Sequence, residues 1–239
     1  MSVFAIADLH LSLGENKPMD VFSGWENYIQ KIEKNWRSVV KETDTVVIAG
    51  DVSWAMKLEE AETDFRFINS LPGRKLIIKG NHDYWWSTKK KIETFLSSHG
   101  FGSISIIHNS AAAAENIAVC GTRGWLYASE APEDVKILNR ETGRLSASID
   151  SAEKLGLEPV VFLHYPPVYD GVECKDIMDV LLKRGIKKCY FGHIHGSAAA
   201  KRAPSGLYGG IEMHLVSCDT VGFTPVLVRQ AKDGNSRNN

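Results

Sequence analysis

The feature that most constrains this fold is a series of short apolar runs separated by much longer amphipathic stretches. Short runs rich in Val and Ile are typical of buried, largely parallel strands. They occupy residues 3–7, 45–49, 75–79, 117–120, 160–163 and 188–191, and runs at 213–217 and 224–228 are two further candidate strands. Because strands that alternate with helices pack in layers, the pattern predicts an α/β sandwich.

The stretches between these runs carry apolar residues at the spacing of a helix. They predict crossover helices around residues 25–40, 65–68, 92–96 and 177–181. A longer helix is predicted over residues 134–155, although Gly143 within it lowers helix propensity. Residues 122–140 are the longest stretch without another obvious element, and we expect a lid or binding loop there.

Composition narrows the class of protein. The chain has 239 residues, with 28 Lys+Arg and 29 Asp+Glu, so its total charge does not favour binding to nucleic acid or to a membrane surface. No long Pro/Gly-rich linker interrupts it, which predicts one domain over residues 1–230 and a disordered tail at 231–239. No apolar run reaches the ~18 to 20 residues of a membrane span, and no basic leader precedes the first run. We therefore expect a cytoplasmic protein without a membrane partner.

Five of the apolar runs end in side chains that bind metals or transfer protons. The segments that follow them are Asp8-Leu9-His10, Gly50-Asp51, Gly80-Asn81-His82-Asp83, His164-Tyr165-Pro166-Pro167 and Gly192-His193-Ile194-His195-Gly196. In open α/β sheets, residues at the carboxyl ends of separate strands meet in one crevice. The alternation in Asp8-x-His10 and His193-x-His195 turns both members of each pair to the same side of an extended chain. Together the segments predict one shared site, in which the glycines permit sharp turns from strand to loop and a close approach of the backbone.

The chemistry of these side chains predicts the kind of site. Aspartate, asparagine and histidine donors without cysteine suit borderline or hard ions such as Mn²⁺, Fe, Zn²⁺ or Co²⁺. The strand ends offer more donors than one tetrahedral zinc ion takes. Two metal ions about 3.5 to 4 Å apart that share a bridging carboxylate would use the whole set, and such a pair clamps the attacking and leaving oxygens in phosphoryl chemistry. The residues therefore predict a binuclear hydrolase.

The order of these motifs resembles that of the calcineurin-like metallophosphoesterases, and the resemblance covers nearly the whole domain. It implies a four-layer α/β/β/α sandwich with two facing mixed β-sheets. It implies that His82 stays off the metals and acts in catalysis. The ligand sets that it implies are Asp8, His10 and His195 for the first metal, and Asn81, His164 and His193 for the second, with Asp51 bridging both.

The activity implied by the resemblance is metal-dependent hydrolysis of a phosphomonoester or phosphodiester. Two divalent ions would activate a hydroxide for in-line attack on phosphorus, and His82 would assist the leaving oxygen. A nuclease of the same superfamily is an alternative that the near-neutral charge does not favour, and a non-catalytic scaffold is another. Trp54 departs from relatives that place an iron-binding tyrosine or an aspartate after Gly-Asp, which indicates divalent rather than ferric ions.

Three residues beside the motifs are candidates for contact with a small phosphoester substrate. Trp54 and Tyr84 could wall a pocket or stack on a nucleobase, or they could pack beneath the loops instead. Arg123 could hold a phosphate oxygen or pair with a surface carboxylate. The role of Asp83 stays open, because it could orient His82 or a neighbouring loop, but adjacent residues of an extended chain point to opposite sides.

Overall fold

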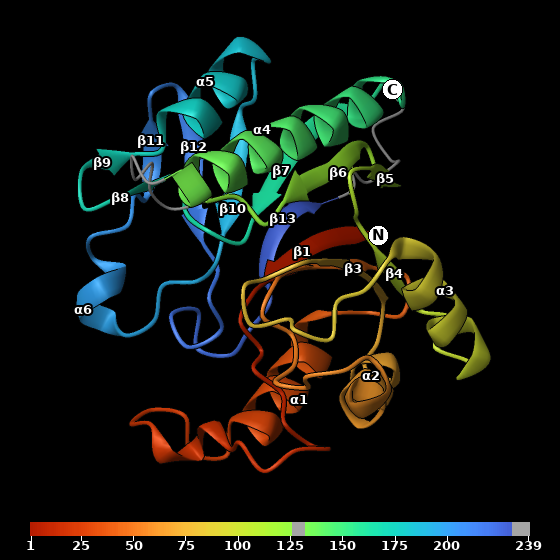
Figure 1. Ribbon diagram of the computed structural model, residues 1–239. Coiled ribbons are helices and arrows are strands. Elements are labelled where there is room, and N and C mark those ends of the chain that lie inside the picture. The colour runs from red at the N-terminus through yellow and green to blue at the C-terminus, as the bar shows by residue number, and fades with distance from the viewer. Residues whose placement is uncertain (126–131, 231–239) are drawn as a thin grey trace, which may run out of the picture.

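The computed structural model describes residues 1–125 and 132–230, and two β-sheets occupy its centre (Figure 1). The first sheet has the strand order β13-β1-β2-β3-β4, in which β13 is antiparallel to β1 and the other pairs are parallel. Its strands are β1 (Ser2–Ile6), β2 (Thr45–Ala49), β3 (Arg74–Ile78), β4 (Ile104–Ile106) and β13 (Val226–Gln230). The tail predicted at 231–239 lies outside the described residues.

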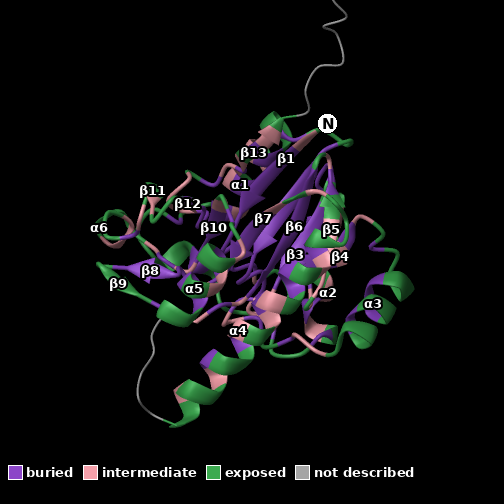
Figure 2. Ribbon diagram, turned by 90° about the horizontal axis from the view of Figure 1, so that it is seen from above, coloured by how far each residue is buried: buried purple, intermediate pink, exposed green. Residues whose placement is uncertain are grey.

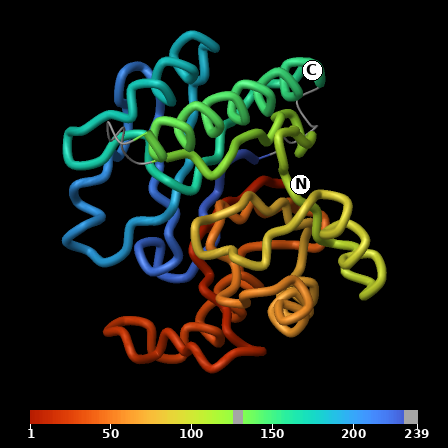
Figure 3. The backbone as a smooth tube through the Cα atoms, viewed as in Figure 1, coloured from red at the N-terminus to blue at the C-terminus, as the bar shows by residue number. Residues whose placement is uncertain are grey.

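The second sheet is formed by strands between residues 111 and 215. Its strand order is β11-β12-β10-β7-β6-β5, with antiparallel pairs at both edges and parallel pairs between them. Its strands are β5 (Ala111–Ala114), β6 (Ile117–Thr122), β7 (Glu158–Leu163), β10 (Lys188–Phe191), β11 (Gly206–Tyr208) and β12 (Ile211–Leu215), and β8 (Val168–Tyr169) pairs with β9 (Val172–Glu173) as a separate hairpin. In Figure 3 the first half of the chain (red to yellow) lies below most of the second half (green to blue), and the last strand, β13, returns to the first sheet.

Helices cover the outer face of each sheet. The helices on the first sheet are α1 (Tyr28–Val39), α2 (Glu62–Ser70) and α3 (Lys89–Ser98), and those on the second are α4 (Pro132–Glu153) and α5 (Lys175–Lys183). The short helices η1 (Met19–Val21), η2 (Glu59–Ala61) and α6 (Ser197–Ala200) lie in loops. The central strands of both sheets are buried beneath these helices (Figure 2). One apolar core lies under each helical layer and a third lies between the sheets, which confirms the predicted four-layer sandwich with two mixed sheets.

The period of two along each strand explains why the runs are continuously apolar. In β2, Val46 and Ile48 belong to the core under the helices, whereas Val47 and Ala49 belong to the core between the sheets. Successive side chains point to opposite faces of a strand. A strand in the middle of four layers therefore has an apolar partner on both sides, and every position favours an apolar residue.

Some elements differ from the sequence prediction. The four alanines at 111–114 form the edge strand β5. The sequence predicts no strand there, because a run of alanines is not typical of a β-strand. Helix α4 begins at Pro132, so helix occupies part of the predicted 122–140 loop, and residues 126–131 of it lie outside the described residues. Gly143 does not interrupt α4, because it lies on the exposed face. Within the described residues, no helix is both long and apolar enough to cross a lipid bilayer.

Candidate metal centre

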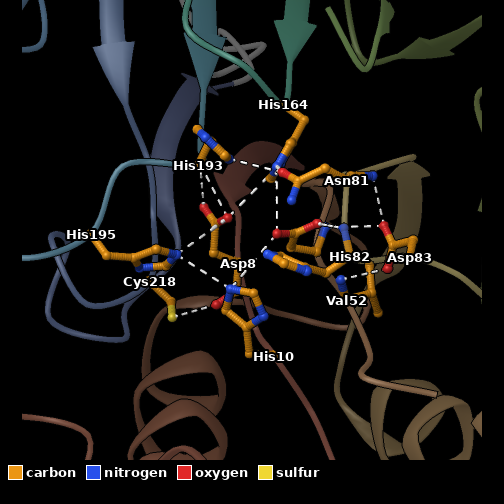
Figure 4. Close-up of polar contacts among 12 residues, drawn as sticks. Asp8, His10, Val52, Asn81, His82, Asp83, His164, His193, His195 and Cys218 are labelled. Atoms are coloured by element: carbon orange, nitrogen blue, oxygen red, sulfur yellow. Dashed lines mark hydrogen bonds and ion pairs between the residues drawn. The ribbon is translucent and has the colours of Figure 1, made fainter. Parts of the chain in front are cut away.

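The predicted ligands meet where the parallel strands of both sheets end (Figure 4). Backbone hydrogen bonds join the loops that follow the strands: the Asp8 N–H donates to Gly50 O over 2.9 Å, and the Gly192 N–H donates to His164 O over 3.0 Å. Asp8, Asp51 and His164 are almost fully buried. The fold therefore brings all seven predicted ligand side chains to one place, from five strand ends.

Four of the predicted ligands adopt a left-handed backbone conformation. The φ angles are +60° at Asp8, +46° at His10, +52° at Asp51 and +72° at His193. This region costs an L-residue about 1 to 3 kcal/mol, and such strain is concentrated at functional sites. The turn that points each donor into the crevice is thus made by the donor residue itself, at the expense of stability.

Two glycines of the motifs are required by close approach. A Cβ atom on Gly80 would lie 2.1 Å from Asp51 Oδ1, and one on Gly192 would lie 2.5 Å from Asp8 Oδ2. Any side chain at these positions would displace a carboxylate of the site. The predicted close approach is confirmed at Gly80 and Gly192, and the predicted sharp turn is confirmed at Gly50, whose φ is +92°.

Asp8, His10 and His195 form the first group of donors. His10 Nε2 lies 3.3 Å from His195 Nε2, and His195 Nε2 lies 3.7 Å from Asp8 Oδ1. Their donor atoms are close enough to share one ion. This is the set that the family resemblance implies for the first metal.

Asn81, His164 and His193 form the second group. Asn81 Oδ1 lies 2.6 Å from His164 Nε2 and 2.9 Å from His193 Nδ1. Asp51 lies between the two groups, because its Oδ2 is 3.8 Å from His10 Nε2 and 3.5 Å from His164 Nε2. A carboxylate in this position can contact ions in both groups.

The donor set fits bound cations. His164 donates its Nδ1 proton to Ala49 O over 3.1 Å, so the neutral ring turns the Nε2 lone pair toward Asn81 Oδ1, which is also an acceptor. Burial lowers the pKa of His164 and His193 to about 3, and burial lowers the pKa of His10 well below its ordinary value. Facing acceptor atoms on neutral rings repel one another, and a shared metal ion would convert the repulsion into bonding.

The two buried carboxylates of the site, Asp8 and Asp51, would also be stabilised by bound cations. Burial raises the pKa of Asp8 to about 7, with a further contribution from the neighbouring Asp51. Burial also raises the pKa of Asp51 to about 6. His195, whose Nε2 lies 3.7 Å from Asp8 Oδ1, is a neighbouring histidine with a raised pKa. One such ring does not balance two buried carboxylates, and divalent ions would supply the remaining positive charge.

Asp219 is a residue of the site that the sequence analysis missed. Its Oδ1 accepts the Nδ1 proton of His195 over 2.9 Å, and its Oδ2 accepts the Gly196 N–H over 2.8 Å. Burial opposes charge on His195, but the hydrogen bond with Asp219 raises the pKa of His195 above its ordinary value. A carboxylate on the far nitrogen fixes the ring orientation of a ligating histidine. Asp219 follows the predicted strand at 213–217, so the rule applied to the other strand ends would have found it.

Asp83 holds the loops of the site and does not orient His82. This fully buried carboxylate accepts the backbone N–H groups of Gly80 (2.7 Å), Asp51 (3.0 Å) and Val52 (2.8 Å). It also accepts the Trp85 Nε1 proton over 2.9 Å. One side chain thus ties the loop after β2 to the loop after β3, which resolves the question left open by the sequence.

His82 and Trp54 line the cavity above the donors. The cavity has a volume of about 480 Å³, and its apolar walls include Met19, Phe22 and Trp25. The Trp54 ring stacks on His10 with centroids 4.8 Å apart and lies 4.6 Å from the His82 ring. The backbone N–H of His82 donates to Asp51 Oδ1 over 2.8 Å, which places His82 beside the donors.

Tyr84 and Arg123 lie outside this cavity. Tyr84 is 53% exposed, with its ring 6.0 Å from that of His82, and it lines a neighbouring surface pocket. Arg123 lines a different, smaller cavity, where its Nη2 lies 3.6 Å from Glu141 Oε1. Of the three predicted substrate contacts, the structure brings Trp54 into the cavity above the donors.

Comparison with known proteins agrees with this geometry. The calcineurin-like phosphoesterase family matches the sequence over residues 1–197, and the chain belongs to this family, whose members are generally metal-dependent phosphoester hydrolases. No curated protein shows significant sequence similarity to the chain.

Two solved structures share the fold. The chain is similar to TT1561 of Thermus thermophilus, with 11% identity, coverage of 95% of this chain and 97% of that one, and a TM-score of 0.58. It is also similar to AQ665 from Aquifex aeolicus, a protein of unknown function, with 16% identity, 95% coverage of both chains and a TM-score of 0.50. At these identities the likeness concerns the fold alone.

Proposed function

We propose that this protein hydrolyses a small phosphoester at a centre of two divalent metal ions. The observation that carries the proposal is the convergence of seven donor side chains, two of them buried carboxylates, with acceptor atoms facing each other at 2.6 Å. A scaffold that had lost its activity would have no reason to retain such a costly arrangement. Family membership agrees with hydrolysis but does not name the ester.

The two groups of donors would each hold one ion. Asp8, His10 and His195 would hold the first, Asn81, His164 and His193 the second, and Asp51 would contact both. When bound, Mn²⁺, Fe²⁺, Zn²⁺ or Co²⁺ ions would activate water and stabilise charge on the phosphoryl oxygens. The chain itself orients the ligands, through Ala49 O on His164 and Asp219 on His195.

His82 is placed to move the proton of the leaving group. Its ring borders the cavity, and its Nδ1 is buried without a hydrogen-bond partner among the described residues. Its backbone bond to Asp51 keeps it beside the proposed metal centre without using a ring nitrogen. A ring nitrogen free of other bonds can protonate or stabilise the leaving oxygen.

The walls of the cavity favour an ester with an apolar or aromatic leaving group. Met19, Phe22, Trp25 and Trp54 offer apolar surface beside His82, and rings of this kind bind flat apolar groups. Among the described residues that line this cavity, none is lysine or arginine. A polyanionic nucleic acid would lack the cations that bind its phosphates, so a small substrate is favoured over a nuclease function.

The function is tested by hydrolysis of p-nitrophenyl phosphate and bis(p-nitrophenyl) phosphate. Metal-stripped protein would be reconstituted separately with Mn²⁺, Fe²⁺, Zn²⁺ and Mg²⁺, and the preferred ester would identify a mono- or diesterase. We expect activity only with metal, and a loss of about 100-fold or more in His82→Ala. The exposed His99 provides the matched control, because His99→Ala removes the same ring outside the site. Metal binding without hydrolysis of either ester would contradict the proposal.

Trp54 tests the apolar wall of the cavity. We expect Trp54→Ala to raise KM for the aromatic ester p-nitrophenyl phosphate more than it raises KM for glycerol 2-phosphate, which has no ring to pack. Tyr208→Ala is the control, because Tyr208 is an aromatic residue on β11 and lines neither this cavity nor the one that contains Arg123. Equal changes in KM for the two esters would show that Trp54 only supports the fold.

A further inference from the structure

A second cavity lies beside the metal centre, at the carboxyl ends of β3, β4 and β6. Its polar walls are Lys79, His108, Arg123, Glu141 and Arg144, and its volume is about 70 Å³. We propose that this cavity binds a single phosphate group, separate from the one that is hydrolysed. The space admits a few water molecules or one tetrahedral oxyanion, and it is too small for a nucleoside.

The charges around the cavity are unbalanced. Glu141 is fully buried, and it accepts the Thr122 hydroxyl proton over 2.7 Å and Arg144 Nη1 over 2.7 Å. Arg123 Nη2 lies 3.6 Å from the same carboxylate. One carboxylate thus faces three cations, because Lys79 lies in the same wall. The excess of positive charge favours a bound anion.

Donor groups in this cavity lack acceptors. Within the described part of the chain, Lys79 makes no hydrogen bond or ion pair, and Arg123 Nε is buried without a partner. Trp86 Nε1 donates to His108 Nδ1 over 3.2 Å, so neutral His108 carries its proton on Nε2. The buried Arg123 Nε–H without an acceptor is costly, and the oxygens of a phosphate group would accept from it and from the Lys79 and His108 donors.

The cavity is connected to the metal centre through the backbone. Lys79 comes two residues before Asn81, and Arg123 O accepts the backbone N–H groups of His164 (3.1 Å) and Tyr165 (2.8 Å). A bound phosphate would therefore contact segments that also carry proposed metal ligands. The phosphate has two possible sources, which are a second phosphate group on the substrate and free inorganic phosphate.

The experiment is an NMR titration of the ¹⁵N-labelled, Zn²⁺-loaded full-length protein. The signals to follow are the amides of Gly121 and Thr122 and the Arg123 Nε–H, with Gly196 as the reporter of the metal centre. Inorganic phosphate and 2,3-bisphosphoglycerate are the two probes. Saturable shifts at 121–123 with phosphate identify free phosphate as the source, and shifts there only with the bisphosphate identify the substrate. The absence of shifts at 121–123 with both probes would overturn the proposal.

Variants of Lys79 make the test specific. We expect Lys79→Met to weaken binding at 121–123 about tenfold or more, and Lys79→Arg to retain it. Lys183→Met is the control, because Lys183 is exposed and paired with Asp179 on α5. Unchanged binding in Lys79→Met would contradict the assignment of Lys79. The readout requires no turnover, so its failure is distinguishable from failure of the proposed hydrolysis.

Discussion

The two ends of the first sheet contain buried charged side chains, and their surroundings differ. At the amino end, Asp44 accepts the N–H groups of Ser2 (2.7 Å) and Lys41 (2.9 Å), and Lys75 donates to Leu71 O and to Ser103 Oγ. At the carboxyl end, Asp8 and Asp51 are buried beside His10 and His164, whose pKa values burial lowers, and His164 Nε2 faces the acceptor Asn81 Oδ1. Charges that the chain satisfies by itself support the fold. Charges that it leaves unsatisfied indicate a ligand.

The largest effect is expected from a change at the carboxyl end. Asp51→Asn keeps the oxygen that accepts the His82 N–H but removes a charge that two metal ions would share. We expect hydrolysis of p-nitrophenyl phosphate to fall by about 10³-fold. The metal-free variant should unfold at the same or a higher urea concentration than the wild type, because its repulsion with Asp8 is gone. A clear loss of metal-free stability would show that Asp51 supports the fold, which would remove the contrast between the two ends.

Asp83→Asn tests whether the carboxyl end also contains a charged residue that stabilises the fold. The amide retains one acceptor oxygen and turns an NH₂ group toward backbone donors, so we expect the free energy of unfolding to fall by about 3 kcal/mol. Activity should fall as well, because the loop that carries Asp51 loses its anchor. Urea denaturation and steady-state hydrolysis of the same preparation measure both effects.

Asp44→Asn is the matched change at the amino end. It removes the same charge from a carboxylate that also accepts backbone N–H groups, and we expect a loss of about 1 kcal/mol in stability. The kcat and KM of the folded variant should equal those of the wild type. Reduced kcat in this variant would mean that the two ends are coupled through the sheet.

Lys75 gives the smallest effect, which depends on pH. Burial lowers the pKa of Lys75 to about 8 in the folded protein, from an ordinary value of 10.5. Between these values the unfolded chain binds more protons than the folded one, so stability increases as pH rises. Comparison of wild type with Lys75→Met by urea denaturation at pH 7.5 and pH 9.5 should show the wild type gaining on the order of 1 kcal/mol. No gain would indicate that Lys75 is more hydrated than its burial suggests.

The sequence predicted the proposed metal ligands better than the residues that hold those ligands in place. The seven proposed ligands follow apolar runs, and parallel strands bring their carboxyl ends together whatever the loops do. Asp219 was missed because it belongs to none of the five motifs, although it follows a predicted strand, and the role of Asp83 was open because most of its partners are backbone groups. Hydrogen bonds to the backbone cannot be predicted from a pattern of side chains, because nearly every residue offers the same backbone groups.

By itself, the sequence determined the class of fold and predicted a metal centre, because the period of apolar residues sets the strands and helices and the donor types favour divalent ions. The tertiary structure decided what each neighbouring residue does. Trp54 lies in the wall above the donors, Arg123 lies in a separate cavity with Lys79, and Asp83 fastens two loops. These roles depend on which loops meet across two sheets, and distances between loops are fixed by packing and not by spacing along the chain.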